Sequence, residues 1–348
     1  MTFSTPLSTR AATAYAELLE TARGLELGRT VAAMSGSFAS KRIRDRTYWY
    51  YQYRDVDDAV RQLYVGPDSP GVRALIDGAR ARERYDQLEP MARAAIELGC
   101  EPIAPTHFTI IRRLADYGFF RADGVLVGTN AFIGLAASLA VRWNESSRTE
   151  DVDFAHAGRR LTIALPTNLT LDVPNALESL ALGFVPTSAF APTGSDATYV
   201  SAKHGLRIDF LTTRTRSDEP VYIENLNVAM QPLPFMELLL EHPEQLALLS
   251  RAGAIVVNVP SPVRLALHKL IVAVERSTQW RAKSVKDLAQ AAALLEAVAR
   301  TDSEIIEREW NDAKRRGPQW KKKLQAGRKA LLAMPGASAI ADSINFAR

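Results

Sequence analysis

The feature that most constrains the fold is an alternation of short apolar strands and helices between residues 119 and 235. It predicts a strand at 124–127 (GVLV), a turn at Gly128-Thr129-Asn130 and an Ala-rich helix at 131–141. Further strands are expected at 151–154, 161–164, 198–202 and 206–212, and a further helix at 174–182. Such interleaving is typical of α/β proteins, so we predict an α/β (α+β) fold with a mixed sheet in its core.

The regions on either side of this core show other patterns of predicted secondary structure. Residues 1–118 predict a helix at 11–30, an aromatic β-hairpin formed by 47–54 and 59–65, and helices at 70–99 and from Thr106 to near Gly118. After the core, helices are expected at 235–249, 262–274 and 285–299, and a strand at 254–259. The tail from Glu304 is charged and is expected to end weakly structured. We therefore expect an N-terminal region (1–118), a central core (119–235) and a C-terminal helical domain with a basic tail (236–348).

Composition narrows the class of protein. With 47% hydrophobic and 24% charged residues, the chain has the profile of a globular protein. Its single cysteine, Cys100, excludes an internal disulfide and a thiolate zinc cluster. No apolar stretch has the length of a membrane span, and residues 1–30 lack a signal-peptide core, so a cytoplasmic location is expected. The net charge of +4 permits an anionic partner without requiring one.

Three carboxylates carry the strongest chemical signal. In the predicted strand Asp151-Val152-Asp153-Phe154, the two acids point to one face and the apolar residues to the other. Asp209 lies in a later predicted strand, on the face opposite Ile208 and Phe210. Three carboxylates on adjacent strands suit two-metal phosphoryl or nucleotidyl transfer, with Mg²⁺ the expected ion and Mn²⁺ an alternative.

A glycine turn precedes these acids. Gly128 and Thr129 follow an apolar strand and open a helix. A small turn in that place frees backbone N–H groups at the helix N-terminus to face a phosphate.

This order of motifs resembles the DNA polymerase β superfamily of nucleotidyltransferases. The superfamily signature is a hydrophobic residue, Gly, then Gly or Ser, and later Asp-x-Asp/Glu; here it corresponds to Val127-Gly128-Thr129, then Asp151 and Asp153, then Asp209. Residues 148–154 (RTEDVDF) are similar to the Arg-x-Ser/Thr-x-Asp segment of bacterial nucleotidyltransferase-fold proteins related to abortive-infection nucleotidyltransferase toxins. Thr129 departs from the usual Gly or Ser, and the gap from Gly128 to Asp151 is longer than in minimal enzymes.

The resemblance implies an activity and assigns roles. A nucleoside monophosphate would pass from a nucleoside triphosphate to an acceptor, with tRNA or another RNA favoured, a protein hydroxyl as the rival, and release of pyrophosphate. It implies metal binding and catalysis by the three acids, with Asp209 also helping to deprotonate the acceptor. The nucleotide would be bound by Gly128, Thr129, Arg148, Lys269 and Asp287.

Several alternatives remain open at this point. Asp55-Val56-Asp57 after Gly36-Ser37 imitates the motif, but it lies between two β-prone runs and is better explained as a solvated acidic turn. For the three proposed site acids, the metal interpretation is favoured over that of solvated strand residues. Lys269 could be a polar-face residue, and Asp287 a helix cap or salt-bridge partner. His156 is interpreted as a loop histidine, and 35–41 (SGSFASK) as a loop without Walker spacing.

Two further clusters carry balanced interpretations. Basic residues at 314–329 surround Trp320, which suits either nucleic-acid binding or a solvated helix face. The aromatic run at 48–53 could stack bases, although such runs in hairpins more often form core and cross-strand pairs. A non-catalytic nucleotide- or nucleic-acid-binding module of the same fold is the second functional hypothesis.

Overall fold

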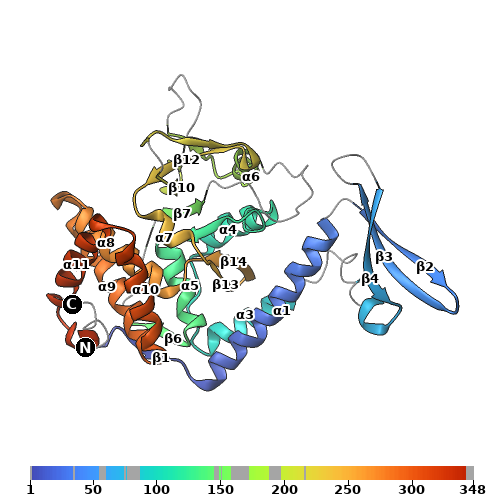
Figure 1. Cartoon of the computed structure of the whole chain (residues 1–348), viewed down its shortest axis with the longest axis horizontal. Coiled ribbons are helices and arrows are strands. Elements are labelled where there is room, and N and C mark those ends of the chain that lie inside the picture. Colours follow the sequence, from blue (N-terminus) through green and yellow to red (C-terminus); the bar gives the residue numbers. More distant parts are fainter. Residues whose placement is uncertain are drawn as a thin grey trace.

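A mixed seven-stranded sheet forms the centre of the molecule (Figure 1). The computed structural model describes residues 2–33, 36–54, 60–73, 76, 87–144, 149, 151–157, 172–187, 197–214 and 217–341. The strand order is β11-β12-β10-β7-β5, with β9 also pairing with β10 and β8 with β9. The bounds are β5 (Val125–Val127), β7 (Asp151–His156), β8 (Val185–Pro186), β9 (Thr198–Ser201), β10 (Leu206–Thr213), β11 (Val221–Ile223) and β12 (Val228–Leu233). The predicted α/β fold class with a mixed sheet is confirmed.

Strands β7 and β10 are parallel neighbours in this sheet, whereas β5 runs antiparallel to β7. Their apolar residues alternate onto one face, where Val152, Phe154, Ile208 and Phe210 are fully buried. The Phe154 and Phe210 rings stack with centroids 5.6 Å apart. Four helices share the hydrophobic core of the sheet: α4 (Pro105–Asp116), α5 (Gly128–Ser138), α6 (Val173–Glu178) and α7 (Met236–Leu240). Because one face is apolar, the polar residues of β7 and β10 are directed to the other.

The C-terminal helices extend the same hydrophobic core. They are α8 (Pro262–Glu275), α9 (Arg281–Ala299), α10 (Ser303–Arg315), α11 (Pro318–Leu332) and α12 (Ser338–Ala341), with a 3₁₀ turn, η3 (Thr278–Trp280), before α9. One continuous cluster of buried residues runs from Ile103 to Ile340 and therefore includes both the sheet and these helices. The expected boundary near residue 235 stays a prediction, and the core crosses it.

Helix α1 (Thr9–Ala33) packs with α3 (Leu88–Glu97) against a hairpin of β13 (Glu244–Ser250) and β14 (Gly253–Val259). The Tyr15 hydroxyl anchors α1 by donating to the Ala247 carbonyl at 3.2 Å. Near the chain start, β1 (Ser4–Pro6) pairs with β6 (Val141–Trp143). These contacts hold the N-terminal helix on the central unit.

A separate three-stranded sheet, which we call the arm sheet, follows α1 and projects away from the central unit (Figure 1). It consists of β2 (Gly36–Ile43), β3 (Arg46–Arg54) and β4 (Val60–Pro67), all antiparallel. The predicted hairpin of two aromatic runs is confirmed as β3–β4. The interpretation of 35–41 as a loop is wrong from Gly36 onward, because this stretch pairs along β3.

Another expectation is also wrong. The predicted helix at 235–249 is a short helix, α7, followed by strand β13. Pro243 cannot continue a helix, and His242 adopts a left-handed conformation with φ of 53°, so the apolar run changes structure between its two halves.

The charged tail from Glu304 forms α10 and α11, because Ile306, Trp310 and Ala313 recur at helical spacing and are buried. Its expected weakly structured end, 342–348, lies outside the described residues.

Smaller differences concern helix starts and coverage. Thr106 does not cap α4, whose N-cap is Ala104 and whose first residue is Pro105. The acidic run 55–58, the strand expected at 161–164, most of 74–86 and Arg148 lie outside the described residues. None of the helices in the described part of the chain is long and apolar enough to cross a membrane.

Candidate active site

Asp153 on β7 and Asp209 on β10 lie directly opposite each other in the parallel register, and Asp151 pairs with Arg207. The sheet therefore brings together acids that are separated by more than fifty residues in the sequence. Their neighbours Val152, Phe154, Ile208 and Phe210 fill the core beneath, which fixes the direction of the acidic face. We call Asp151, Asp153 and Asp209, together with Gly128, the carboxylate site.

Gly128 closes the site from the adjacent strand. Val127 pairs with Asp153 across β5 and β7, so Gly128 follows immediately beside that acid. It has φ of +67°, and a Cβ at this position would lie 2.1 Å from Asp153 Oδ2. Only glycine allows both the left-handed turn and this close approach. The expectation of a small turn beside the acids is thus met in space.

Mutual repulsion and burial dominate the electrostatics of the site. Burial, followed by the charges of Asp209 and Asp151, raises the pKa of Asp153 to about 7. The charges of Lys269 and Lys283 lower this pKa but do not offset the burial and the repulsion. The observation fits a site that gains from a hard cation with oxygen ligands, such as Mg²⁺.

The outer acids have polar partners. Asp209 accepts hydrogen bonds from Arg207 Nε at 2.8 Å and from Thr198 Oγ1 at 2.6 Å. Asp151 Oδ2 lies 3.5 Å from Lys283 Nζ. With the side chains so engaged, the described residues contain no group of three His, Cys, Asp or Glu gathered closely enough to hold a metal ion. Binding of one ion by all three acids therefore requires side-chain positions other than those in this structure.

Helix α5 begins at Gly128 and directs its first turn toward this edge of the sheet. Its N-cap, Val127, provides no side-chain hydrogen bond to the first N–H groups. Asn130 in that turn donates to the Asp151 carbonyl at 3.1 Å, and its Oδ1 lies 3.2 Å from His107 Nδ1. These contacts fix the helix start against β7. Thr129 is buried, and its contact with a phosphate stays a prediction.

A family model described as nucleotidyltransferase matches residues 106–315, more than half of the chain. The chain belongs to this nucleotidyltransferase family. The matched span contains the carboxylate site, α5 and both α8 and α9, whereas the arm sheet lies outside it. No curated protein and no solved structure matches the chain. The family supports nucleotidyl transfer with a nucleoside triphosphate as substrate.

In this nucleotidyltransferase, Lys269 and Asp287 form a buried ion pair between α8 and α9. Lys269 Nζ lies 3.1 Å from Asp287 Oδ1, and Arg276 Nε lies 3.0 Å from Asp287 Oδ2. Burial opposes the charge of Asp287, but the two cations outweigh it and lower the pKa of that carboxyl. Asp287 is therefore a salt-bridge partner, as one of its two interpretations expected. The nucleotide contacts of Lys269 and Asp287 stay predictions.

Lys283 and Trp280 were not expected at the site. Lys283 Nζ lies 5.2 Å from the centroid of the Trp280 ring and also approaches Asp151. Trp280 is 49% exposed, an unusual state for so large an apolar side chain. No motif signals either residue, because the contact of Lys283 with Asp151 joins residues far apart in the sequence.

His156 is not a loop histidine. It ends β7, is buried, and its Nε2 lies 2.9 Å from the Ala122 carbonyl. Burial lowers the pKa of His156, so it is a neutral structural residue.

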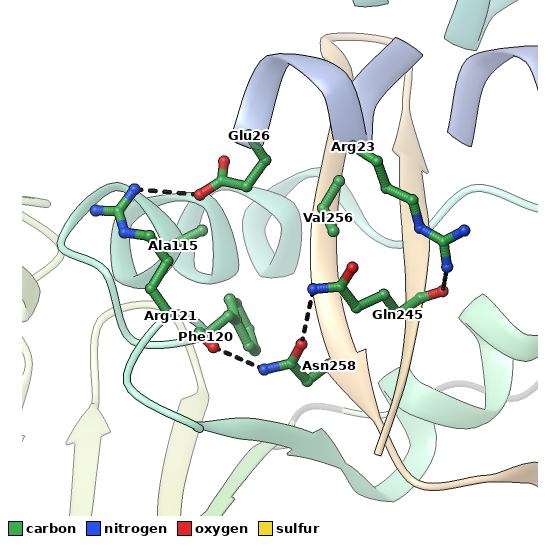
Figure 2. A pocket seen from close by; sticks show the side chains of 8 residues that line it. All are labelled: Arg23, Glu26, Ala115, Phe120, Arg121, Gln245, Val256 and Asn258. Atoms are coloured by element: carbon green, nitrogen blue, oxygen red, sulfur yellow. Dashed lines mark hydrogen bonds and ion pairs between the residues drawn. The ribbon is translucent and has the colours of Figure 1, made fainter. Parts of the chain in front are cut away.

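A cavity of about 180 Å³ lies elsewhere, between α1, the end of α4 and the β13–β14 hairpin (Figure 2). Arg121 pairs there with Glu26 at 3.1 Å, and Asn258 donates to the Phe120 and Gly124 carbonyls. Asn258 thereby holds the backbone that leads into β5. The cavity contains none of the residues of the carboxylate site, so its contacts are structural.

Proposed function

We propose that the chain is a Mg²⁺-dependent nucleotidyltransferase that moves a nucleoside monophosphate from a nucleoside triphosphate to an acceptor. The observation that carries this proposal is the placement of Asp153 opposite Asp209, with Gly128 pressed against Asp153. A bound divalent ion, Mg²⁺ or Mn²⁺, would polarise the α-phosphate and stabilise its developing negative charge. Asp151, Asp153 and Asp209 would hold it.

The chain's own groups supply the remaining steps. The first-turn N–H groups at Gly128 and Thr129 would bind a phosphate of the triphosphate. Asp209 would accept the proton of the acceptor hydroxyl, whose oxygen forms the new bond to the α-phosphorus as the bond to the β-phosphate breaks. Pyrophosphate leaves. We assign Arg148 and Lys269 to the charge of the phosphates, and Asp287 to holding Lys269 in place.

Lys283 and Trp280 add a place for the nucleoside. Lys283 Nζ is close to both the Trp280 ring and Asp151, so a triphosphate bound at the carboxylate site would lie near Lys283. The exposed Trp280 face then suits stacking with the base, because every base has a π-face. This contact predicts affinity for several bases rather than strict choice of one.

The same residues support a proposal about the superfamily to which this family belongs. We propose that the family belongs to the DNA polymerase β superfamily, near the bacterial proteins related to abortive-infection nucleotidyltransferase toxins. The supporting feature is the order strand, Gly128 turn, helix, Asp-x-Asp strand and Asp209 strand. We favour tRNA or another RNA as the acceptor, with a protein hydroxyl as the rival.

The decisive experiment incubates the full chain with each α-³²P-labelled triphosphate, Mg²⁺ or Mn²⁺, and either total RNA or cell protein. Transfer of label is expected with the wild type and its loss with Asp151→Ala/Asp153→Ala. Asp218→Ala is the matched control, because the Asp218 carboxylate is exposed and pairs only with Arg214 among the described residues. Trp280→Ala should raise KM for the triphosphate while leaving kcat nearly unchanged.

Two results would contradict the proposal. One is absence of labelling by the wild type under every condition while the triphosphate still binds, which supports the non-catalytic binding module instead. The other is full labelling by the Asp151→Ala/Asp153→Ala variant. Labelling of RNA or of protein identifies the acceptor class.

A further inference from the structure

The arm sheet precedes the span matched by the nucleotidyltransferase family and contains none of the carboxylate site. Three tyrosines gather on one of its faces. The Tyr64 ring centroid lies 5.6 Å from that of Tyr50 and 6.2 Å from that of Tyr48. Tyr64 is 55% exposed, and the other two are partly exposed. We call these three residues the tyrosine face.

The opposite face of the arm sheet is the covered one. Tyr51 is buried there and packs edge-on against Phe38 at 5.0 Å. Trp49 Nε1 donates to Asp68 at 3.0 Å, and Val72 lies close over Gly66. The sheet therefore has its own small core on one side. Its tyrosine face is not needed for that core.

Basic residues lie next to the tyrosine face, around the turn between β2 and β3. The stretch 41–46 (KRIRDR) contains four basic residues and one acid, and all six are solvent-exposed. Lys41 Nζ lies 5.0 Å above the Tyr50 ring and hydrogen-bonds to Gln62. Lys41 and Arg46 share the face of the tyrosines, because Lys41 lies opposite Tyr48 and Arg46 is two residues before Tyr48 on β3.

We infer that the arm sheet is a binding surface for single-stranded nucleic acid. Exposed aromatic rings stack on bases, and the adjacent Lys41 and Arg46 complement the phosphates. A single strand fits better than a duplex, because the bases of a duplex are stacked on one another and present no free face to tyrosine. The inference concerns binding and does not depend on the proposed transfer reaction.

The other basic region of the chain lacks the aromatic component. Trp320 in α11 is buried, 4.8 Å from the Phe235 ring centroid and under the Arg316 guanidinium. Lys321 and Lys322 are exposed on the same helix without an exposed ring beside them among the described residues. This helix therefore supplies a matched control for charge without stacking.

The test measures binding of the full chain, without triphosphate, to fluorescent oligouridylate, oligodeoxythymidylate and a duplex of equal length. The expected order is tight binding of one or both single strands and weak binding of the duplex. Tyr50→Ala/Tyr64→Ala should weaken binding by about 10-fold or more with an unchanged salt slope. Lys41→Gln/Arg46→Gln should weaken binding and reduce the salt slope by about 1.4.

Controls separate recognition from folding. Lys321→Gln/Lys322→Gln removes the same charge from α11 and should leave affinity nearly unchanged. Tyr50→Phe/Tyr64→Phe keeps the rings and should bind like the wild type, so a folding defect in the alanine variant cannot be mistaken for lost stacking. Hydrogen-exchange protection of β2–β4 in the alanine variant, compared with the wild type, reports whether the arm sheet is intact.

Three outcomes would overturn the inference. They are no binding by the wild type, equal affinity for duplex and single strand, and loss of binding in the α11 variant but not in the arm variants. The affinities for oligouridylate and oligodeoxythymidylate show whether the surface binds RNA, DNA or both. If label transfer also fails, the binding result still stands alone, because its readout contains no reaction.

Discussion

Gly128 places the backbone directly against a carboxylate of the site. Its left-handed φ of +67°, and the 2.1 Å that would separate a Cβ from Asp153 Oδ2, leave no room for a side chain. Gly183 has the same φ of +67°, but a Cβ there would meet nothing within 4 Å. The two glycines therefore share a left-handed backbone conformation, but only Gly128 lies against Asp153.

We predict that Gly128→Ala and Gly183→Ala each cost about 1 kcal/mol of unfolding free energy through left-handed strain. Gly128→Ala alone should also reduce label transfer, by about 100-fold, because a shift of Asp153 on the ångström scale misplaces the reacting groups. Urea unfolding and the transfer assay measure the two effects. Equal activity in the two variants would contradict the role of Gly128.

The pKa of Asp153 predicts a pH dependence of stability. Because the pKa of about 7 in the folded state exceeds its ordinary value of 3.8, the folded state holds this proton more tightly. Without divalent ions, this contribution to stability is full below about pH 4 and is lost as the pH rises to about 7. Asp153→Asn removes that loss.

The Asp153→Asn variant should therefore be more stable than the wild type by about 1–3 kcal/mol above pH 7, and nearly equal to it at about pH 4. Mg²⁺ at the higher pH should stabilise the wild type and not the variant. Thermal unfolding across the pH range, with and without Mg²⁺, measures both. A pH-independent difference between the proteins would contradict the buried, repelled carboxylate.

Residue patterns predicted the carboxylate site well and its surroundings poorly. Alternation in the two strands placed Asp151, Asp153 and Asp209 on one face, since period-two burial is local in the sequence. The contact of Lys283 with Asp151 joins residues far apart in the sequence, and no local pattern encodes such a contact. The catalytic and metal-binding roles remain predictions.

At the scale of elements, the α8–α9 pair carries the buried ion pair of Lys269 with Asp287. Asp287→Ala leaves Lys269 buried without its carboxylate, which should cost about 3 kcal/mol of unfolding free energy. Glu89→Ala, which breaks the exposed pair with Arg93 on α3, should cost less than about 1 kcal/mol. Chemical unfolding of the two variants makes the comparison.

A double variant separates stability from nucleotide binding. Lys269→Met/Asp287→Leu replaces the pair with apolar groups and should recover most of the lost stability. Label transfer should remain impaired, with a raised KM for the triphosphate, if Lys269 contributes to phosphate binding. Recovery of both properties would show that the pair serves folding alone.

Element prediction failed where apolar runs had no clear period. The run from Phe235 to Leu249 is rich in leucine throughout, so hydrophobicity alone did not separate α7 from β13; Pro243 was the local signal. In the tail, the high charge of α10 and α11 concealed a regular apolar stripe that includes Trp310 and Trp320. Strands and helices with clean periodicity, such as β10 and α8, were predicted correctly.

At the scale of the whole molecule, the main core and the arm sheet differ in how much they bury. The core runs without interruption from Ile103 to Ile340, whereas Tyr51 is the one large apolar side chain buried in the described part of the arm sheet. We predict that amides of β2–β4 exchange with solvent much faster than those of β7, β10, α8 and α9. Hydrogen-exchange mass spectrometry tests this.

The same experiment examines the core as a unit. Because β7 and β10 share one hydrophobic cluster with α8 and α9, their slowest amides should exchange with similar free energies. Early exchange of α8–α11 as a group, with β7 and β10 still protected, would show that the C-terminal helices unfold independently.

Helix α1 has a consequence for the size of substrates. Its 25 residues span roughly 37 Å, and its end leads into the arm sheet (Figure 1). A single strand that contacts both the arm sheet and the carboxylate site has to extend from the end of α1 to β7 and β10. An oligonucleotide too short for that span would occupy one surface at a time. Acceptor length, more than base sequence, would then decide which strands are modified efficiently.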